Sequence, residues 1–367
     1  MTAAKQRVEA VRQKFGEAGI DGLLVTHPTN RRYLTGFTAD DTPPNESSGH
    51  LIVGSDDIVL VTGSVNVTQA EAQAPHVRVV NRDPSWAACD AAIVQELGIH
   101  RIGYEADAIL ESVHRGIGDA LNAENHEFEW VPVDGLVEEF RAIKSSDEIA
   151  LIKKAFEITN AAFERVAPTI AAGQTEAEIA WRIHKAFIEL GAEGPAFPTI
   201  VAAGTNAARP HHEPGETIIS GGQPIVIDMG AKYHGYCADL TRTVWVGEPD
   251  EQLKAVYPVV AAAVEQVFER LSSGVKGSEM DTVARDYIDQ HGFGEAFTHG
   301  LGHGVGLRVH EAPSFSKKSE DILAPGNIVT IEPGVYLPEW GGVRVEDVVL
   351  MTEDGFEILT TASKKHI

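Results

Sequence analysis

The spacing of hydrophobic residues in the first third of the chain predicts alternating helices and strands. In residues 4–18, Val8, Val11 and Phe15 recur at intervals of three and four, which is the period of an amphipathic helix. A second helical pattern covers residues 86–97. Short apolar runs bounded by turn residues predict strands, and these runs lie at 22–27, 49–54, 57–63 and 101–107. The alternation favours a compact α/β unit.

From about residue 141 the pattern changes to longer helices. Ser145 and Thr175 are each followed three residues later by a glutamate, which is the spacing of a capping box at a helix start. We therefore expect a pair of helices at 148–170 and 176–190. Strand-like runs follow these helices, at 224–230, 238–247, 327–336 and 342–352.

The length of 367 residues supports two domains. Together with the change of pattern, it predicts a smaller α/β domain at residues 1–137. Residues 138–367 are predicted to form a larger α+β domain, in which helices cover antiparallel strands.

The charge and cysteine content exclude several classes of protein. Asp and Glu number 54 against 30 Lys and Arg, so the formal charge is −24, which disfavours binding to nucleic acid or to an anionic membrane. Two cysteines cannot form a disulfide framework. The charged N-terminal segment lacks the apolar stretch of a secretory signal, and the longest apolar run, about ten residues, is too short to span a bilayer. We expect a cytoplasmic protein.

Two aspartates stand beside apolar strands, where carboxylates are unusual. Asp228 ends one strand and Asp239 follows it by 11 residues. If the intervening turn is centred near 233–234, the two aspartates lie opposite each other, with Cβ atoms about 4.5–5.5 Å apart. Carboxylates that close repel each other, so a positive group is expected between them. The alternative is that one aspartate caps a turn and the other pairs with Arg242.

Three histidines lie among glycines in the segment THGLGHGVGLRVHE. They are His299, His303 and His310. The segment matches neither the dinucleotide-binding fingerprint nor the H-E-x-x-H zinc motif. Each histidine alone is compatible with an ordinary hydrogen-bonded side chain, but the cluster beside flexible glycines favours a functional site.

Two glutamates complete the set of candidate residues. Glu332 interrupts an apolar strand, and Glu346 follows Arg344 by two positions, which places both on one face of the predicted strand. Arg344 is expected to orient Glu346 or a neighbouring acid. A purely structural Arg344–Glu346 ion pair is the alternative.

Four carboxylates and one imidazole together suit divalent ions of the Mn, Co, Zn or Fe kind. Four negative charges also balance two divalent ions, and a two-metal site can activate water near neutral pH. The residues therefore predict a metal-assisted hydrolase.

The order Asp, Asp, His, Glu, Glu, at spacings of 11, 64, 29 and 14, resembles the dinuclear metallopeptidases of the pita-bread fold. The motifs IDMGAKYHGYCADLTRT, THGLGHGVGLRVHEAP, IEPGVY and GGVRVEDV are similar to those of the Xaa-Pro branch, which comprises prolidase and aminopeptidase P. YLTGF at 33–37 and the hinge RAIKSSDEI resemble the creatinase-type N-terminal domain and its connection. The resemblance covers nearly the whole chain.

This resemblance implies a role for each candidate residue. The implied metal ligands are Asp228, Asp239, His303, Glu332 and Glu346, of which Asp239 and Glu346 would touch both ions. Glu332 would also act as the proton shuttle for a metal-bridging hydroxide. The implied catalytic or substrate-binding residues are His211, His299, His310 and Arg344. His211 is favoured over the adjacent His212, whose position varies in the family.

The implied activity is metal-dependent hydrolysis of the Xaa-Pro bond in dipeptides or short peptides. It needs two divalent ions, with Mn²⁺ preferred to Co²⁺ or Zn²⁺. The implied partners are proline-containing peptides and a second copy of the chain in a homodimer. The alternatives are an Xaa-Pro aminopeptidase acting on longer peptides, a methionine aminopeptidase-like enzyme, and a peptide-binding relative without catalysis. A methionine aminopeptidase is not expected to carry the N-terminal domain.

Overall fold

The computed structural model describes residues 3–41, 43 and 45–364. The chain divides into two compact units, residues 1–141 and 142–367, whereas the sequence placed the division after residue 137. Helix α7 (Glu138–Ala142) covers the residues between these two limits. The two domains, one α/β and one α+β, are thus present as expected.

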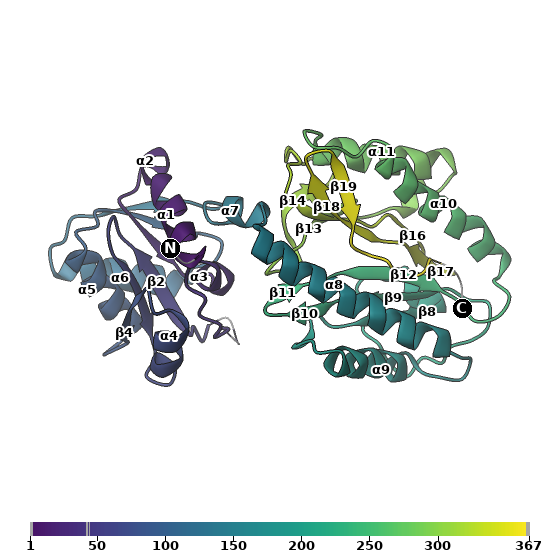
Figure 1. Ribbon diagram of the computed structural model, residues 1–367, viewed down its shortest axis with the longest axis horizontal. Coiled ribbons are helices and arrows are strands. Elements are labelled where there is room, and N and C mark those ends of the chain that lie inside the picture. The colour runs from purple at the N-terminus through teal and green to yellow at the C-terminus, as the bar shows by residue number, and fades with distance from the viewer. Residues whose placement is uncertain (1–2, 42, 44, 365–367) are drawn as a thin grey trace. The chain divides into compact units, whose positions relative to one another are not determined.

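A mixed six-stranded sheet with the order β4-β3-β2-β1-β5-β6 forms the centre of the first unit (Figure 1). Its strands are β1 (Gly22–Val25), β2 (Gly49–Val53), β3 (Ile58–Thr62), β4 (Arg78–Asn81), β5 (Arg101–Tyr104) and β6 (Glu129–Pro132). Strands β1, β5 and β6 are parallel, as are β3 and β4, whereas β2 is antiparallel to both of its neighbours. Each of the four strands predicted here is present.

Helices cover this sheet and close its core. They are α1 (Ala3–Gln13), α2 (Phe15–Ala18), α3 (Pro28–Thr35), α4 (Val67–Gln73), α5 (Trp86–Glu96) and α6 (Glu111–Ala123), with α7 at the end of the unit. The predicted first helix is divided into α1 and α2, and its apolar positions Val8, Val11 and Phe15 are buried as the periodicity requires. Ile117 and Leu121 of α6 pack with strand residues such as Leu24 in the main core.

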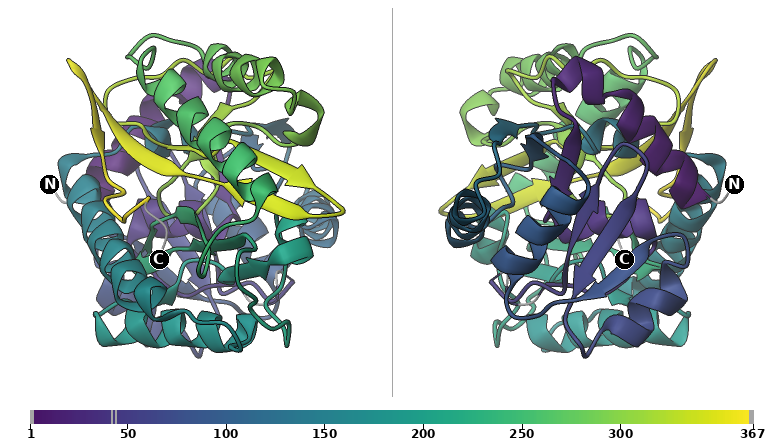
Figure 2. Two further views of the ribbon diagram at one scale, coloured as in Figure 1. Left: turned by 90° about the vertical axis from the view of Figure 1, so that its right-hand side faces the viewer. Right: turned by 90° about the vertical axis from the view of Figure 1, so that its left-hand side faces the viewer.

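Two helix pairs enclose the strands of the second unit. They are α8 (Ser146–Val166) with α9 (Glu176–Glu189), and α10 (Glu251–Phe268) with α11 (Gly277–Gln290). Both predicted capping boxes are formed at Ser145 and Thr175. Figures 1 and 2 show α8 and α9 on one side of this unit and α10 and α11 on the other, with strands between them.

The strands of the second unit are short and mostly antiparallel. Its first half holds β7 (Gly194–Pro195), β8 (Ile200–Ala203), β9 (Ile225–Met229), β10 (Ala231–Tyr233), β11 (Tyr236–Cys237) and β12 (Leu240–Val244). Its second half holds β13 (Gly302–Gly304), β14 (Glu311–Phe315), β15 (Ile328–Ile331), β16 (Gly334–Leu337), β17 (Gly341–Arg344), β18 (Asp347–Thr352) and β19 (Gly355–Ile358). Three-residue to five-residue 3₁₀ turns lie at Ala167–Thr169, Gly204–Ala208 and Gly294–Ala296.

The sheets of the second unit follow its two halves. The strand orders are β12-β9-β8 and β11-β10-β7 in the first half, and β14-β13-β15-β18-β19 and β16-β17 in the second. One apolar core joins α8 and α9 to β8, β9 and β12, and another joins α10 and α11 to β15 and β18. The candidate site residues come from both halves, with Asp228 on β9 and Glu332 and Glu346 beside strands of the second half.

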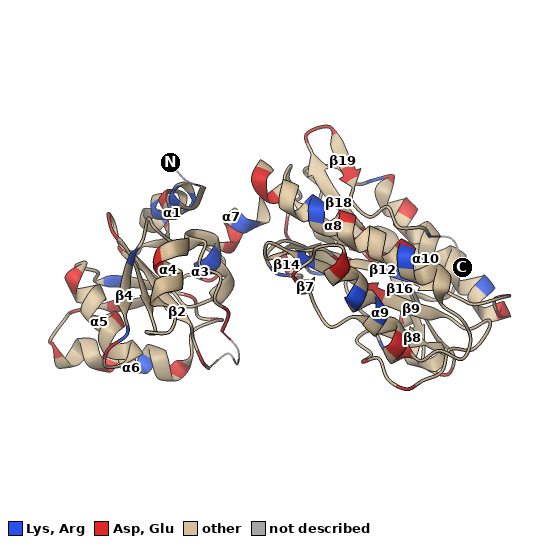
Figure 3. Ribbon diagram, turned by 60° about the horizontal axis from the view of Figure 1, so that its bottom comes forward, with Lys and Arg blue, Asp and Glu red and all other residues tan. Residues whose placement is uncertain are grey.

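Three features of the structure bear on the classes of protein that charge, cysteine content and hydropathy exclude. Among the described residues, none of the helices combines the length and apolar character needed to cross a bilayer. Cys89 and Cys237 are both buried, and neither forms a disulfide. Figure 3 shows acidic and basic positions interspersed over the helices and loops of both units.

Candidate metal centre and active site

The hairpin that carries Asp228 and Asp239 has a different register from the predicted one. Asp228 pairs with Thr241, not with Asp239, because the turn is centred on His234 and Gly235. Both of these residues have positive φ, 46° and 82°, as a tight two-residue turn requires. The position opposite Asp228 is thus taken by Thr241, and Asp239 lies two residues before it, in the break between β11 and β12.

Glu346 enters this site from a strand break. The apolar run predicted as one strand at 342–352 is divided into β17 and β18, so Arg344 and Glu346 do not share a continuous strand. β17 pairs with β16 while β18 pairs with β15. The chain changes partner at Val345–Glu346, where the Glu346 amide donates to the Thr241 carbonyl at 3.1 Å.

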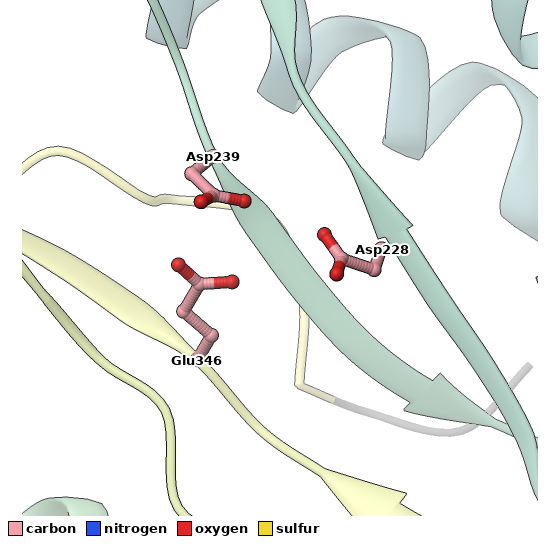
Figure 4. Close-up of side chains that lie close together, drawn as sticks. All are labelled: Asp228, Asp239 and Glu346. Carbon is pink, nitrogen blue, oxygen red and sulfur yellow. The ribbon is translucent and has the colours of Figure 1, made fainter. Parts of the chain in front are cut away.

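Three carboxylates converge between these strands. One oxygen from each of Asp228, Asp239 and Glu346 lies within 4.8 Å of the others, and Figure 4 shows the three side chains pointing toward one another. Asp239 and Glu346 are buried. Oδ1 of Asp228 and Oε1 of Glu346 are buried without a hydrogen-bond partner among the described residues.

The electrostatics of this cluster favour a cation. Burial raises the pKa of Asp228, and burial followed by the charges of the neighbouring carboxylates raises the pKa values of Asp239 and Glu346 well above their usual range. A divalent ion would reverse these shifts by supplying positive charge and accepting the unpartnered oxygens. The residues present thus fit a divalent metal.

His303 and Glu332 join the same cluster. His303 Nδ1 donates to the Gly304 carbonyl at 3.0 Å, so a neutral His303 presents an unprotonated Nε2. That Nε2 lies 3.1 Å from Glu332 Oε1 and 3.8 Å from Asp239 Oδ2. A lone pair facing two carboxylates requires either a proton or a metal ion on Nε2, which is the second observation that fits a metal.

Glu332 also enters from a strand break, since the predicted strand at 327–336 is divided into β15 and β16. Thr330 Oγ1 donates to Glu332 Oε1 at 3.0 Å and accepts from the His303 amide at 2.9 Å. Burial opposes ionisation of Glu332, but the hydrogen bond and charge of His303 lower the pKa of Glu332 to about 2. The same contact raises the pKa of His303 against the effect of its burial.

A buried arginine fixes one side of the cluster. Arg344 Nη2 donates to Asp228 Oδ2 at 2.7 Å, and its Nε donates to Thr241 Oγ1 at 3.1 Å. Its Nη1 donates to the Tyr336 hydroxyl at 2.9 Å. The acid that Arg344 orients is thus Asp228. Arg242 forms its ion pair with Asp347 at 2.9 Å, so the alternative in which Asp228 or Asp239 pairs with Arg242 is wrong.

His299 is connected to the same arginine through Tyr336. His299 Nδ1 donates to the Gly300 carbonyl at 2.7 Å, and its Nε2 accepts from the Tyr336 hydroxyl at 2.9 Å. Burial lowers the pKa of His299, which favours the neutral imidazole that this hydrogen bond needs. The order of donors therefore runs from Arg344 to Tyr336 to His299.

A cavity of about 980 Å³ opens onto these residues. Its wall includes every predicted site residue except Glu346, namely His211, Asp228, Asp239, His299, His303, His310, Glu332 and Arg344. The rings of His303 and His310 meet edge to face, with centroids 4.2 Å apart. Burial and then the neighbouring His303 lower the pKa of His310. The structure thus brings the predicted residues together around one cavity.

Sequence reasoning missed three polar residues that support this site. They are Thr241, Thr330 and Tyr336, which hold Arg344, Glu332 and His299 respectively. Thr241 pairs across the strands with Asp228, so the register of the hairpin could have marked Thr241. Tyr336 closes the quoted motif IEPGVY. No comparable pattern identifies Thr330, which is buried within an apolar strand.

Family models match both parts of the chain. Residues 150–353 match the metallopeptidase family M24, and residues 7–143 match the creatinase/prolidase N-terminal domain. These matches confirm the pita-bread fold with a creatinase-type N-terminal domain that the motifs implied.

Three relatives are similar over almost their whole length. An Xaa-Pro dipeptidase of Pyrococcus furiosus is 34% identical over 98% of this chain and 99% of its own. The solved structure of an Xaa-Pro dipeptidase from Bacillus anthracis superposes with a TM-score of 0.92, at 37% identity and with 99% of each chain covered. An X-Pro aminopeptidase from Thermotoga maritima superposes with a TM-score of 0.85, at 34% identity over 97% of this chain and 99% of its own.

Proposed function

The chain belongs to metallopeptidase family M24, and on this premise we propose that it is a metal-dependent Xaa-Pro dipeptidase. The observation that carries the proposal is the buried, mutually repelling cluster of Asp228, Asp239 and Glu346 beside the cavity. A cluster of this kind needs a cation, and the three full-length relatives described above are named as Xaa-Pro peptidases.

The proposed metal ligands are Asp228, Asp239, His303, Glu332 and Glu346. Their four carboxylates balance the charge of two divalent ions, and their oxygen-rich set suits Mn²⁺ at least as well as Co²⁺ or Zn²⁺. When bound, such ions supply Lewis-acid chemistry, which polarises a carbonyl and lowers the pKa of water.

The side chains around the cluster provide the remaining functions. Glu332 is ionised at neutral pH and is proposed to move a proton from the attacking water to the proline nitrogen that leaves. His310 is neutral at pH 7 because its pKa is lowered, so its N–H can donate to the carbonyl oxygen of the bond that breaks. His211 and His299 are proposed to line the substrate site, and Arg344 to hold Asp228 in place.

Dipeptides are proposed as the preferred substrates because two of the three relatives described above are dipeptidases. The X-Pro aminopeptidase of similar structure supports the alternative, cleavage at the N-terminus of longer peptides. The match of residues 7–143 to the creatinase/prolidase domain disfavours a methionine aminopeptidase. Both Xaa-Pro activities share the same centre, so their distinction rests on substrate length.

Hydrolysis of a small peptide panel tests this proposal. The full-length protein is stripped of metal, and Mn²⁺, Co²⁺ or Zn²⁺ is added back before it is given Ala-Pro, Ala-Pro-Ala and Met-Ala-Ser. We expect the protein to cleave Ala-Pro only after metal has been added back, and the highest rate is expected with Mn²⁺. Asp239→Ala should lower kcat/KM by more than about 100-fold, since even the residues that only orient metal ligands matter by 10–100-fold.

The matched control is Asp286→Ala, which removes an exposed aspartate of α11 that lies outside the candidate centre. It should retain the wild-type rate. Preference for Ala-Pro-Ala would indicate the aminopeptidase, and cleavage of Met-Ala-Ser alone would indicate a methionine aminopeptidase. No cleavage of any peptide by protein with bound metal would contradict the proposal.

A homodimer in the cytoplasm is also proposed. The resemblance to prolidases supports the dimer, and two buried cysteines without a disulfide are compatible with a reducing compartment. Light scattering should give twice the chain mass of 39.5 kDa, and cell fractionation should recover the protein with cytosolic enzymes.

A further inference from the structure

A buried carboxylate outside the metal centre gathers hydrogen bonds from three segments of the second unit. Glu176, the first residue of α9, is fully buried. Its Oε1 accepts from the Ala203 amide at 2.8 Å and from Asn206 Nδ2 at 3.0 Å. Its Oε2 accepts from His212 Nε2 at 2.8 Å and from the Gly215 amide at 3.2 Å. Four donors compensate the burial of one charge.

His212 lies in a segment that forms one wall of the cavity. This wall segment, residues 209–214, contributes each of its six residues to the cavity lining. His211, proposed above as a substrate-binding residue, is exposed within it. The wall segment contains Pro210 and Pro214, which have no amide hydrogen to donate.

At the start of the wall segment the Arg209 amide donates to the Asn206 carbonyl at 2.9 Å, and beyond Pro210 the hydrogen bonds are those of His212. Among the described residues between Pro210 and Pro214, only His212 makes hydrogen bonds to residues outside 210–214. Its amide donates to the Arg209 carbonyl at 3.2 Å, and its imidazole donates to Glu176. Because a carboxylate only accepts, Nε2 of His212 carries the proton. The side chain of His212 therefore connects the part of the wall between the two prolines to Glu176.

We propose that Glu176 and His212 are positioning residues that hold the wall segment, and with it His211, against the cavity. The inference rests on the proposed function for the role of His211, but the ordering of the wall does not depend on the reaction. Neither residue is among the proposed metal ligands. The family resemblance favoured His211 over His212 as the substrate-binding residue. In this proposal His212 acts indirectly, by positioning His211.

Two amide substitutions of His212 separate this role from general stability. In His212→Gln the side-chain nitrogen occupies nearly the position of Nε2 and still reaches Glu176. In His212→Asn the nitrogen corresponds to Nδ1 and falls short of Glu176. The two variants thus carry the same functional group and differ by one methylene. His184→Asn on the exposed side of α9 is the matched control, because His184 stacks on Trp181 and does not line the cavity.

The first measurement is steady-state hydrolysis of Ala-Pro by the Mn²⁺-loaded full-length protein. We expect His212→Asn to raise KM about tenfold with a much smaller change in kcat, because the wall contributes to substrate binding. His212→Gln should restore KM to within about twofold of the wild type, and His184→Asn should leave it unchanged. Thermal unfolding of His212→Gln and His184→Asn should remain near that of the wild type, whereas His212→Asn should unfold a few degrees lower because a buried carboxylate loses one of its four donors.

The second measurement is backbone hydrogen exchange of the peptide that covers residues 211–217, with no substrate present. His212→Asn should accelerate exchange about tenfold, and His212→Gln should not. If His212→Asn changes neither KM nor exchange, the inference is wrong. If the wild type cleaves no Xaa-Pro peptide while the exchange pattern is as expected, the proposed function fails and the ordering of the wall by Glu176 and His212 stands.

Discussion

The hydroxyl of Tyr336 serves two neighbours at once, since it accepts from Arg344 and donates to His299. Each neighbour makes a further hydrogen bond that fixes its position. Arg344 donates to Asp228, and His299 donates to the Gly300 carbonyl. A single oxygen atom therefore links a side chain that orients a metal ligand to a histidine of the cavity wall. This is the kind of supporting contact on which metal sites depend.

We predict that Tyr336→Phe destabilises the protein by about 1–3 kcal/mol, because the change leaves buried donor and acceptor atoms of Arg344 and His299 unsatisfied. Urea unfolding of the metal-free protein measures the loss. Tyr287→Phe of α11 is the matched control, since no hydrogen bond of its hydroxyl is found among the described residues, and it should change stability by less than about 0.5 kcal/mol. Equal effects of the two substitutions would contradict the assigned hydrogen bonds.

At the scale of elements, strand breaks determine where the glutamates lie. Glu332 and Glu346 each stand between two short strands that pair with different partners. Along a continuous strand, successive side chains point alternately to the two faces of the sheet. Because the chain changes partner at these positions, both carboxylates turn toward the hairpin that carries Asp228 and Asp239.

A buried ion pair connects the start of the second unit to β14. Lys144 Nζ lies 2.8 Å from Glu311 Oε1, and the two side chains are 1% and 5% exposed. Glu311 directly follows His310, so the pair holds the end of the histidine-bearing loop. Gly306 is needed for this approach, since a Cβ there would lie 2.1 Å from the same Glu311 oxygen.

We predict that Lys144→Met destabilises the second unit by about 3–5 kcal/mol, because it removes the ammonium group that faces the buried charge of Glu311. The double variant Lys144→Met with Glu311→Met should recover much of this loss. Lys153→Met provides the control, since the Lys153–Glu357 pair is equally short at 2.7 Å but 38% and 50% exposed, and its loss should cost less than about 1 kcal/mol. Similar losses in Lys144→Met and Lys153→Met, measured by urea unfolding, would show that burial does not decide the effect.

At the scale of the whole molecule, each unit has its own core and its own buried charge. In the first unit Glu105 follows β5 and accepts from the amides of Thr26 and His27, each at 2.7 Å, and from Asn30 Nδ2 at 2.6 Å. Burial nevertheless raises the pKa of Glu105 to about 7, with a further contribution from the charge of Glu138. The folded protein therefore binds a proton at Glu105 more tightly than the unfolded chain does.

The sign of the resulting pH dependence follows from that difference. Between the unfolded pKa of 4.5 and the folded pKa of about 7, the unfolded chain loses its proton first, so this contribution to stability is lost as pH rises. We predict that the stability of the wild type relative to Glu105→Gln falls by about 3 kcal/mol between pH 4 and pH 8. Urea unfolding of both proteins at a series of pH values measures this difference. A difference that is independent of pH would contradict the raised pKa.

The sequence by itself determined many of the elements and the donor chemistry of the candidate centre. The capping boxes at Ser145 and Thr175, the strands of the first sheet and the two-domain organisation follow from local pattern, because period and capping act over a few residues. The donor types of Asp228, Asp239, His303, Glu332 and Glu346 were likewise sufficient to predict a divalent metal, because ligand preference depends on the kind of atom offered.

Only the tertiary structure decided how those donors meet. The register of the hairpin depends on which two residues adopt positive φ, and the breaks beside Glu332 and Glu346 depend on which sheets the strands join. Thr330, Tyr336 and Glu176 acquire their roles from partners distant in sequence or on another element, such as the bond from His212 to Glu176, 36 residues away. Contacts between remote segments are set by packing of the whole unit, so no local pattern carries them.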